Sequence, residues 1–170
     1  MRSVLMLLVF ISAGASSAFA QTDPVRPAAT SAVGPWEAVV WTGGKTVLRC
    51  TLSRAKPTQD GFSYGFLIDR TGILFGVEHK SWTFASEAAL PGTLAPQSGA
   101  ERKLSAKPAT PTRANFDLPT AMLDQLQRSE HLDVQIGARK ARLPFDDFNA
   151  ARVTLEICVQ QIGKDYEAGR

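Results

Sequence analysis

The sequence has few of the residues that usually carry chemistry, with 2 cysteines and 2 histidines among 170 residues. It contains no C-x-x-C, H-E-x-x-H, G-x-S-x-G or phosphate-binding-loop motif. The sequence therefore predicts no catalytic residue, no cofactor-binding residue and no metal ligand. A hydrolase remains an alternative, because an active site assembled from distant residues leaves no local pattern.

The isolated titratable residues have simpler interpretations than catalysis. His79 and His131 lie far apart in the sequence and have no partner histidine at metal-ligand spacing, which indicates two surface histidines. Asp146 and Asp147 are adjacent carboxylates at the start of an amphipathic segment. Two acids in that position are typical of a helix cap rather than of an acid–base pair.

A strong excess of either charge is also missing, since 19 Lys and Arg residues face 16 Asp and Glu residues. This balance argues against binding to nucleic acid, which requires a clustered positive field. The densest basic segment holds Arg139, Lys140 and Arg142, and on a strand Lys140 and Arg142 would share the outward face. Two interpretations remain: a charged edge that blocks sheet aggregation, or an anion-binding site for lipid or sugar headgroups.

The first twenty residues have the pattern of a secretory signal peptide. Arg2 precedes the apolar run Val4 to Ile11, and Ala18-Phe19-Ala20 fits a signal-peptidase site. We predict cleavage after Ala20, a mature chain that begins at Gln21, and a periplasmic location. No later apolar run approaches the roughly 20 residues of a membrane span, so the sequence predicts no transmembrane segment in the mature chain.

An exported chain with two cysteines allows one intramolecular disulfide. We expect a bond between Cys50 and Cys158. The alternative is a redox or metal pair, although neither cysteine has a second cysteine or a histidine close to it in the sequence.

Residues 21–35 are rich in proline and small polar residues, which predicts a disordered leader. Residues 36–170 then form one β-rich domain. Short β-prone segments with turn residues between them run from Trp36 to Phe84, and Trp82–Phe84 is the last of these predicted strands. In the second strand, Leu48, Cys50 and Leu52 should face one side. Residues 91–115 contain four prolines and fit edge strands such as 102–106 and a mobile loop equally well.

Two helices are expected. The first opens at Pro119 and ends near Ser129. The second spans 147–162, begins at a cap formed by Asp146 or Asp147 and stops at Gly163. Its predicted inner face repeats with helical period and consists of Phe148, Ala151, Leu155, Cys158, Val159 and Ile162. The fold class is therefore β-rich α+β, an antiparallel sheet or β-sandwich of roughly six to eight strands with the C-terminal helix packed on the sheet.

These features together resemble the invasion-associated locus B-like family, small periplasmic proteins of proteobacteria. The resemblance rests on the exported leader, the Trp-containing first strand, Cys50, the run Gly61-Phe-x-Tyr-Gly-Phe66 and the ending Phe148-x-x-Ala151-x-x-x-Leu155-x-x-Cys158. It covers most of residues 36–162. Family members tend to have glycine just before the helical Phe, where this chain has Asp147. The resemblance implies a β-rich fold with a C-terminal helix and a periplasmic location, and brings no catalytic residue.

Three functional hypotheses follow. The first is a non-enzymatic interaction or envelope-associated protein with an unknown protein or envelope partner. The second is a binding module for a small or anionic envelope ligand, for which Arg139, Lys140 and Arg142 are the candidate residues. The third is a hydrolase.

Overall fold

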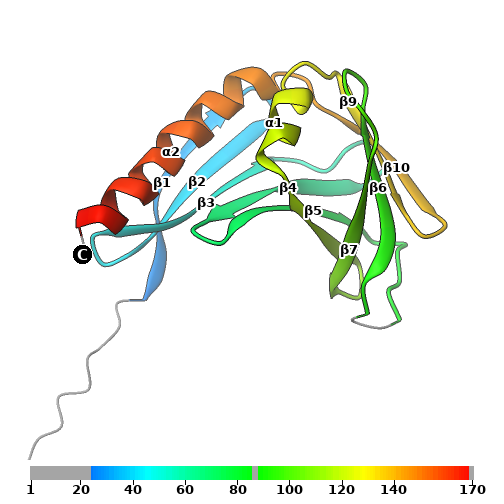
Figure 1. Ribbon diagram of the computed structural model, residues 1–170, viewed down its shortest axis with the longest axis horizontal. Coiled ribbons are helices and arrows are strands. Elements are labelled where there is room, and N and C mark those ends of the chain that lie inside the picture. The colour runs from blue at the N-terminus through cyan, green and yellow to red at the C-terminus, as the bar shows by residue number, and fades with distance from the viewer. Residues whose placement is uncertain (1–23, 86–87, 169–170) are drawn as a thin grey trace, which may run out of the picture.

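The computed structural model describes residues 24–85 and 88–168, which form an antiparallel sheet of ten strands and two helices (Figure 1). The strand order across the sheet is β1-β2-β3-β4-β5-β8-β7-β6-β9-β10. The bounds are β1 Val25–Val33, β2 Trp36–Gly43, β3 Thr46–Arg54, β4 Phe62–Asp69, β5 Gly72–His79, β6 Leu90–Pro96, β7 Arg102–Thr110, β8 Arg113–Leu118, α1 Thr120–Leu126, β9 His131–Ile136, β10 Arg139–Pro144 and α2 Phe148–Ala168.

The predicted fold class is confirmed: the chain is β-rich and antiparallel, and α2 packs on the sheet. Strands β1 to β5 follow one another as a meander, and β5 then pairs with β8 rather than with β6. The strands form one sheet, which is strongly bent. Figure 1 shows α2 lying along β1, β2 and β3, while β6, β7, β9 and β10 run steeply at the other end of the sheet.

The prediction of a disordered leader at residues 21–35 is wrong for residues 25–33, which form β1. This strand pairs with β2, and its register shifts between Pro27 and Ala29. Its side chains are exposed apart from Val33, so backbone pairing at the sheet edge holds it rather than burial. An edge strand with a bulge tolerates proline, which the composition alone does not reveal. The predicted signal peptide, residues 1–20, lies outside the described residues.

The proline-rich segment 91–115 also forms strands. It contributes β6, β7 and the start of β8, and these strands together with β1 raise the strand number above the predicted six to eight. Pro96 ends β6, and Pro108 lies at the register shift of β7 against β8. The prolines therefore occupy strand ends and irregular positions, where a missing backbone N–H costs little.

Two details of the first half differ from the prediction. The register of β2 against β3 shifts so that Leu48 is the extra residue, and Val47, rather than Leu48, is buried with Cys50 and Leu52. A bulge reverses the alternation of side chains, which a strict period of two cannot anticipate. The segment Trp82–Phe84 is irregular rather than a strand, although both Trp82 and Phe84 are buried.

Helix α1 begins after Pro119 and ends at Leu126, earlier than predicted. The Ser129 hydroxyl donates a hydrogen bond to the Gln125 carbonyl oxygen at 2.8 Å, which gives a partner to an acceptor at the end of this short helix.

Helix α2 continues through Gly163 to Ala168, so the predicted stop at Gly163 is wrong. Gly163 is exposed, and a Cβ added there would meet nothing within 4 Å, so no contact forces the helix to end. The predicted inner face is confirmed at all positions except Val159, which is 39% exposed. The buried residues recur every three or four positions and form one narrow stripe, Phe148, Ala151, Leu155, Cys158 and Ile162.

The start of α2 has an unusual backbone. Asp147 has φ of 57°, in the left-handed region that favours glycine, and aspartate is one of the few other residues that adopt it. This is the position where the invasion-associated locus B-like family tends to have glycine. The carboxylate of Asp146, the neighbouring residue, accepts a hydrogen bond from Arg54 Nη1 at 2.8 Å.

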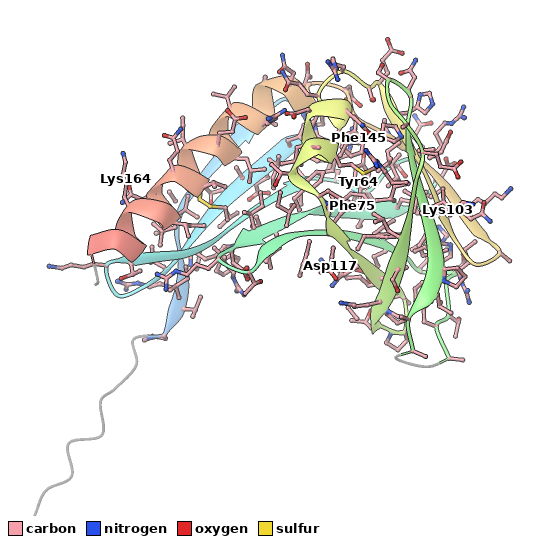
Figure 2. The ribbon with its side chains drawn as sticks, in the orientation of Figure 1. Tyr64, Phe75, Lys103, Asp117, Phe145 and Lys164 are labelled. Carbon is pink, nitrogen blue, oxygen red and sulfur yellow. A yellow bond between two sulfur atoms is a disulfide. The ribbon has the colours of Figure 1, made fainter. Side chains whose placement is uncertain are left out.

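The core between the sheet and α2 is aromatic. Trp36 is fully buried, and its ring centroid lies 5.4 Å from that of Phe145 and 5.2 Å from that of Phe148. Figure 2 shows Tyr64, Phe75 and Phe145 gathered near the helices, with Asp117 on the other side of the sheet. The predicted assignment of the aromatic residues to the core is confirmed for the members Phe62, Tyr64, Phe66, Trp82 and Phe84.

Candidate functional site

The Cys50–Cys158 disulfide is present and joins β3 to α2 across 108 residues of chain. The Cα atoms are 6.2 Å apart, and both cysteines are buried. This bond leaves no free thiol to bind a metal in the oxidised chain. It fixes the middle of α2 on the sheet.

A polar cluster fixes the start of α2. The Trp36 indole Nε1 donates to the Asp146 carbonyl oxygen at 2.8 Å, and Arg54 Nη1 pairs with the Asp146 carboxylate. The Tyr64 hydroxyl donates to the Pro144 carbonyl oxygen. Burial raises the pKa of the Tyr64 phenol well above its usual value, against the opposing effect of Arg54. The cluster therefore has a structural function: it ties the loop between β10 and α2 to strands β2, β3 and β4.

The predicted basic segment lies on β10, at the edge of the sheet. Lys140 and Arg142 are exposed on one face, as expected, while Ala141 and Leu143 are buried on the other. Arg142 donates to both carboxylate oxygens of Asp133, at 2.7 and 3.0 Å. Arg139 donates to the Thr83 carbonyl oxygen, and its guanidinium lies 4.8 Å from the Phe84 ring centroid. Two of the three predicted anion-binding side chains thus already have partners within the chain.

A shallow hollow of about 490 Å³ lies on this outward face, across β6, β9 and β10. Lys140 and Arg142 line it together with the acidic residues Asp133 and Glu101. Opposite charges therefore balance in the hollow. Anion binding by Arg139, Lys140 and Arg142 stays a prediction.

Arg142 holds the pKa of the Asp133 carboxyl below its usual value, chiefly by hydrogen bonding. Replacing Arg142 with glutamine should raise this pKa toward about 4, the ordinary value of an aspartate. The sign follows from linkage: a depressed pKa gives a stabilising contribution that is present above about pH 4 and lost as the pH falls. NMR titration of the Asp133 carboxyl carbon measures the change. Lys140→Gln is the matched control and should leave the pKa nearly unchanged; an equal shift in both variants would contradict the pairing.

A second hollow, about 400 Å³ in volume, lies in the middle of the sheet on the face opposite to the helices. We call it the β3–β8 groove, and its principal outward-facing lining residues are Trp41, Arg49, Thr51, Ser53, Ser63, Gly65, Leu67, Gly76, Glu78 and Arg113. Gly65 and Gly76 are paired directly across β4 and β5. No local sequence motif marks this groove, because its residues come from several strands. Its one sequence signal is glycine inside two strands, which often marks a close approach of another group to the backbone.

A third, more apolar hollow of about 350 Å³ lies between α1, α2 and the turn that joins β4 to β5. Ile68, Ile73 and Leu123 line it together with the exposed Val159. Arg152 lies at the rim of this hollow, where its side chain is mostly covered and pairs with Asp124 at 2.7 Å. This ion pair connects the two helices.

The two histidines lie in different parts of the fold, and each contacts groups close to it. His79 stacks on Phe62 at 4.4 Å between ring centroids, and its Nδ1 lies 2.7 Å from the Ser81 hydroxyl. His131 lies 3.9 Å from Asp133. Within the described ranges 24–85 and 88–168, no group of three or more His, Cys, Asp or Glu side chains could hold a metal ion. The same ranges contain no helix that is long and apolar enough to cross a membrane.

Comparisons with known proteins bear on the fold. No family model matches the chain. No curated protein sequence matches it either. Among solved structures, the chain is similar to the crystal structure of invasion associated protein B from Bartonella henselae, with a TM-score of 0.58 and 14% sequence identity. The match covers 78% of this chain and 97% of that protein. The chain therefore shares its fold with invasion associated protein B.

Proposed function

We propose that this chain is an exported, non-enzymatic interaction protein of the bacterial envelope, which acts through a protein or envelope partner in the periplasm. The observation that carries the proposal is the fold shared with invasion associated protein B over nearly all of that protein. The same family was indicated independently by residues 36–162 of the sequence. Fold and sequence pattern thus support one functional class.

Two further features support export. Residues 1–20 have the charge, apolar core and Ala-x-Ala site of a signal peptide. The Cys50–Cys158 disulfide needs an oxidising compartment in which to form and persist, such as the periplasm. A cytosolic chain would keep both thiols reduced, and its helix α2 would be held on the sheet by packing alone.

Expression of the full-length chain in its native host should yield a periplasmic protein that begins at Gln21 and has no free thiol. Cell fractionation followed by intact-mass measurement, with and without thiol alkylation under denaturing conditions, checks all three points. An Ala18→Arg, Ala20→Arg variant is the control and should stay uncleaved, because the signal peptidase requires small residues at these positions. A cytosolic wild-type chain with two free thiols would contradict the proposal.

Crosslinking in the periplasm of the same host tests the interaction itself. A photo-crosslinking amino acid placed at Ser63, on the outward face of the sheet, should give an adduct of one defined mass. The same label at Lys164, on the exposed side of α2, is the control for random collisions. Adducts of equal yield at both positions, or at neither, would contradict a partner on the sheet face.

The second candidate function is a binding module for a small or anionic ligand. The hollow beside Lys140 does not favour it, because Asp133 and Glu101 balance the cations there. The β3–β8 groove does favour it, because the cationic side chains of Arg49 and Arg113 line it.

A further inference from the structure

The β3–β8 groove has a floor built by glycine. At Gly76, an added Cβ would lie 2.5 Å from Arg113 Nη2, and at Gly65 it would lie 2.6 Å from the Leu52 carbonyl oxygen. The guanidinium of Arg113 therefore lies directly against the backbone of β5. Asn115 Oδ1 accepts a hydrogen bond from Arg113 Nε at 3.2 Å and orients the side chain. The two glycines therefore leave room for close neighbours, the Arg113 and Asn115 side chains at Gly76 and the β3 backbone at Gly65.

A second arginine lines the same groove. The Arg49 guanidinium lies 4.9 Å from the Trp41 ring centroid, and the Trp41 indole is oriented by a hydrogen bond to Thr51 Oγ1 at 3.1 Å. Arg49 Nε is buried and has no hydrogen-bond partner. The aromatic contact holds the guanidinium in place, and because Nε is buried only the Nη groups could donate to a ligand.

Neither arginine forms a close ion pair, although Asp69 is paired with Arg49 across β3 and β4 and the two charges interact. In the part of the chain that the structure describes, no carboxylate oxygen lies within 4.0 Å of a guanidinium nitrogen of Arg49 or Arg113. Glu78 is paired with Arg113 across the strands, but its carboxylate accepts a hydrogen bond from the Thr112 hydroxyl at 2.9 Å. This contrasts with Arg142 on β10, whose guanidinium is paired with Asp133.

The rest of the lining is mixed, with apolar residues such as Trp41 and Leu67 beside hydroxyl groups. Thr51, Ser53 and Ser63 supply hydroxyl groups to the lining. The strands beneath them are inside the sheet, where each is hydrogen-bonded to a neighbour on both sides. The groove therefore offers no free backbone edge to an extended peptide, which usually binds by adding a strand. It offers two planar cationic forks and several hydroxyls.

We propose that the β3–β8 groove binds an anionic saccharide, with Arg49 and Arg113 each receiving an oxyanion and Thr51, Ser53 and Ser63 receiving sugar hydroxyls. Guanidinium groups match carboxylate and phosphate geometry through two parallel hydrogen bonds, and side-chain hydroxyls both donate and accept. This inference deepens the proposed envelope function by naming a ligand class for the sheet face, and it rests on that function only for the compartment.

The test uses the purified mature chain, so that a failure of export and a failure of binding are distinguishable. Trigalacturonate is the probe, at low salt, and binding is followed by backbone amide chemical shifts. The fully methyl-esterified trisaccharide is the matched probe, because it keeps the sugar rings and removes the charges. Tetraglutamate is the peptide probe. We expect shifts with trigalacturonate at 49–53, 63–67, 76–78 and 113, weakening as salt is raised, and much smaller shifts with the other two probes.

Variants test the geometry. Arg113→Gln changes an exposed side chain and should weaken binding about tenfold or more, the usual effect of losing hydrogen bonds between charged groups. Gly76→Ala keeps both charges but displaces the Arg113 guanidinium, and it should weaken binding as well. Arg49→Gln should act in the same direction, with thermal unfolding as the control for its lost contact with Trp41. Lys140→Gln and Arg142→Gln should leave the affinity unchanged.

Three results would overturn the proposal. The first is no shift of the groove amides with trigalacturonate at low salt. The second is equal binding of the methyl ester or of tetraglutamate, since the site would then not select an anionic saccharide. The third is an affinity that depends on Lys140 and Arg142 rather than on Arg113, which would place the site on the β10 edge.

Discussion

Removal of the Cys50–Cys158 disulfide should lower the free energy of unfolding by about 2–5 kcal/mol, a large part of the roughly 5–15 kcal/mol expected for one domain. The bond closes a loop of 108 residues, and closing so long a loop restricts the unfolded chain strongly. It also connects the middle of α2 to β3, the strand with which α2 makes most of its contacts. The loss is measured by denaturant unfolding of the oxidised protein and of a Cys50→Ala, Cys158→Ala variant.

The helix should loosen before the sheet when the bond is absent. Without the covalent link, α2 can still pack on the strands through its buried residues Phe148, Ala151, Leu155 and Ile162. Amide exchange across 148–164 should therefore become faster than exchange in β3, β4 and β5. Reduction of the wild type is the control, because it breaks the link and keeps both sulfur atoms in the core. Loss of less than about 1 kcal/mol in both proteins would mean that packing alone holds the helix.

Helix α2 shows what periodicity in a sequence can predict. Only one narrow stripe of the helix packs against the sheet, so its buried residues recur every three or four positions and can be identified from the sequence. These residues are Phe148, Ala151, Leu155, Cys158 and Ile162. Val159 breaks the pattern, since its side chain lines the hollow between the two helices and stays partly exposed. The helix end was not predictable from Gly163, because a glycine stops a helix only where the chain needs a left-handed residue.

Hydrophobic periodicity cannot predict a strand whose side chains are all or nearly all exposed. Strand β1 keeps its place through backbone hydrogen bonds to β2, and its composition resembles that of a disordered segment. The bulge at Leu48 likewise arises from the pairing of β2 with β3, which no property of Leu48 itself indicates. In both cases the neighbouring strand determines the structure.

The candidate site was the feature least predictable from the sequence. Lys140 and Arg142 are an obvious candidate site because they are close together in the sequence. In the structure, however, Arg142 is paired with Asp133 on the neighbouring strand. Arg49 and Arg113 are 64 positions apart in the sequence. They line the same groove only because the strand order is β3-β4-β5-β8. Basic residues that are clustered in the sequence predict a local positive charge. Whether a carboxylate pairs with them depends on the tertiary structure.

Replacement of Trp36 by alanine should have the largest effect of any single substitution in the core, lowering the free energy of unfolding by about 3–5 kcal/mol. The indole is fully buried, and its ring centroid lies between 5.2 and 6.4 Å from the centroids of Phe148, Phe145, Tyr64 and Phe66. The substitution leaves a cavity at the centre of this cluster. It also removes the hydrogen bond to the Asp146 carbonyl oxygen, which helps to hold the start of α2.

Two further variants separate the cavity from the hydrogen bond. Trp36→Phe keeps most of the ring volume and removes the donor, so it should cost about 0.5–1.5 kcal/mol for the lost hydrogen bond and somewhat more for the smaller ring. Trp41→Ala is the matched control, because Trp41 lies on the same strand but faces the β3–β8 groove and is only partly buried. It should cost less than half as much as Trp36→Ala. If the two alanine variants were equally destabilised, the helix-covered face of the sheet would not be the principal core, and the attachment of α2 would depend on the disulfide rather than on the aromatic cluster around Trp36.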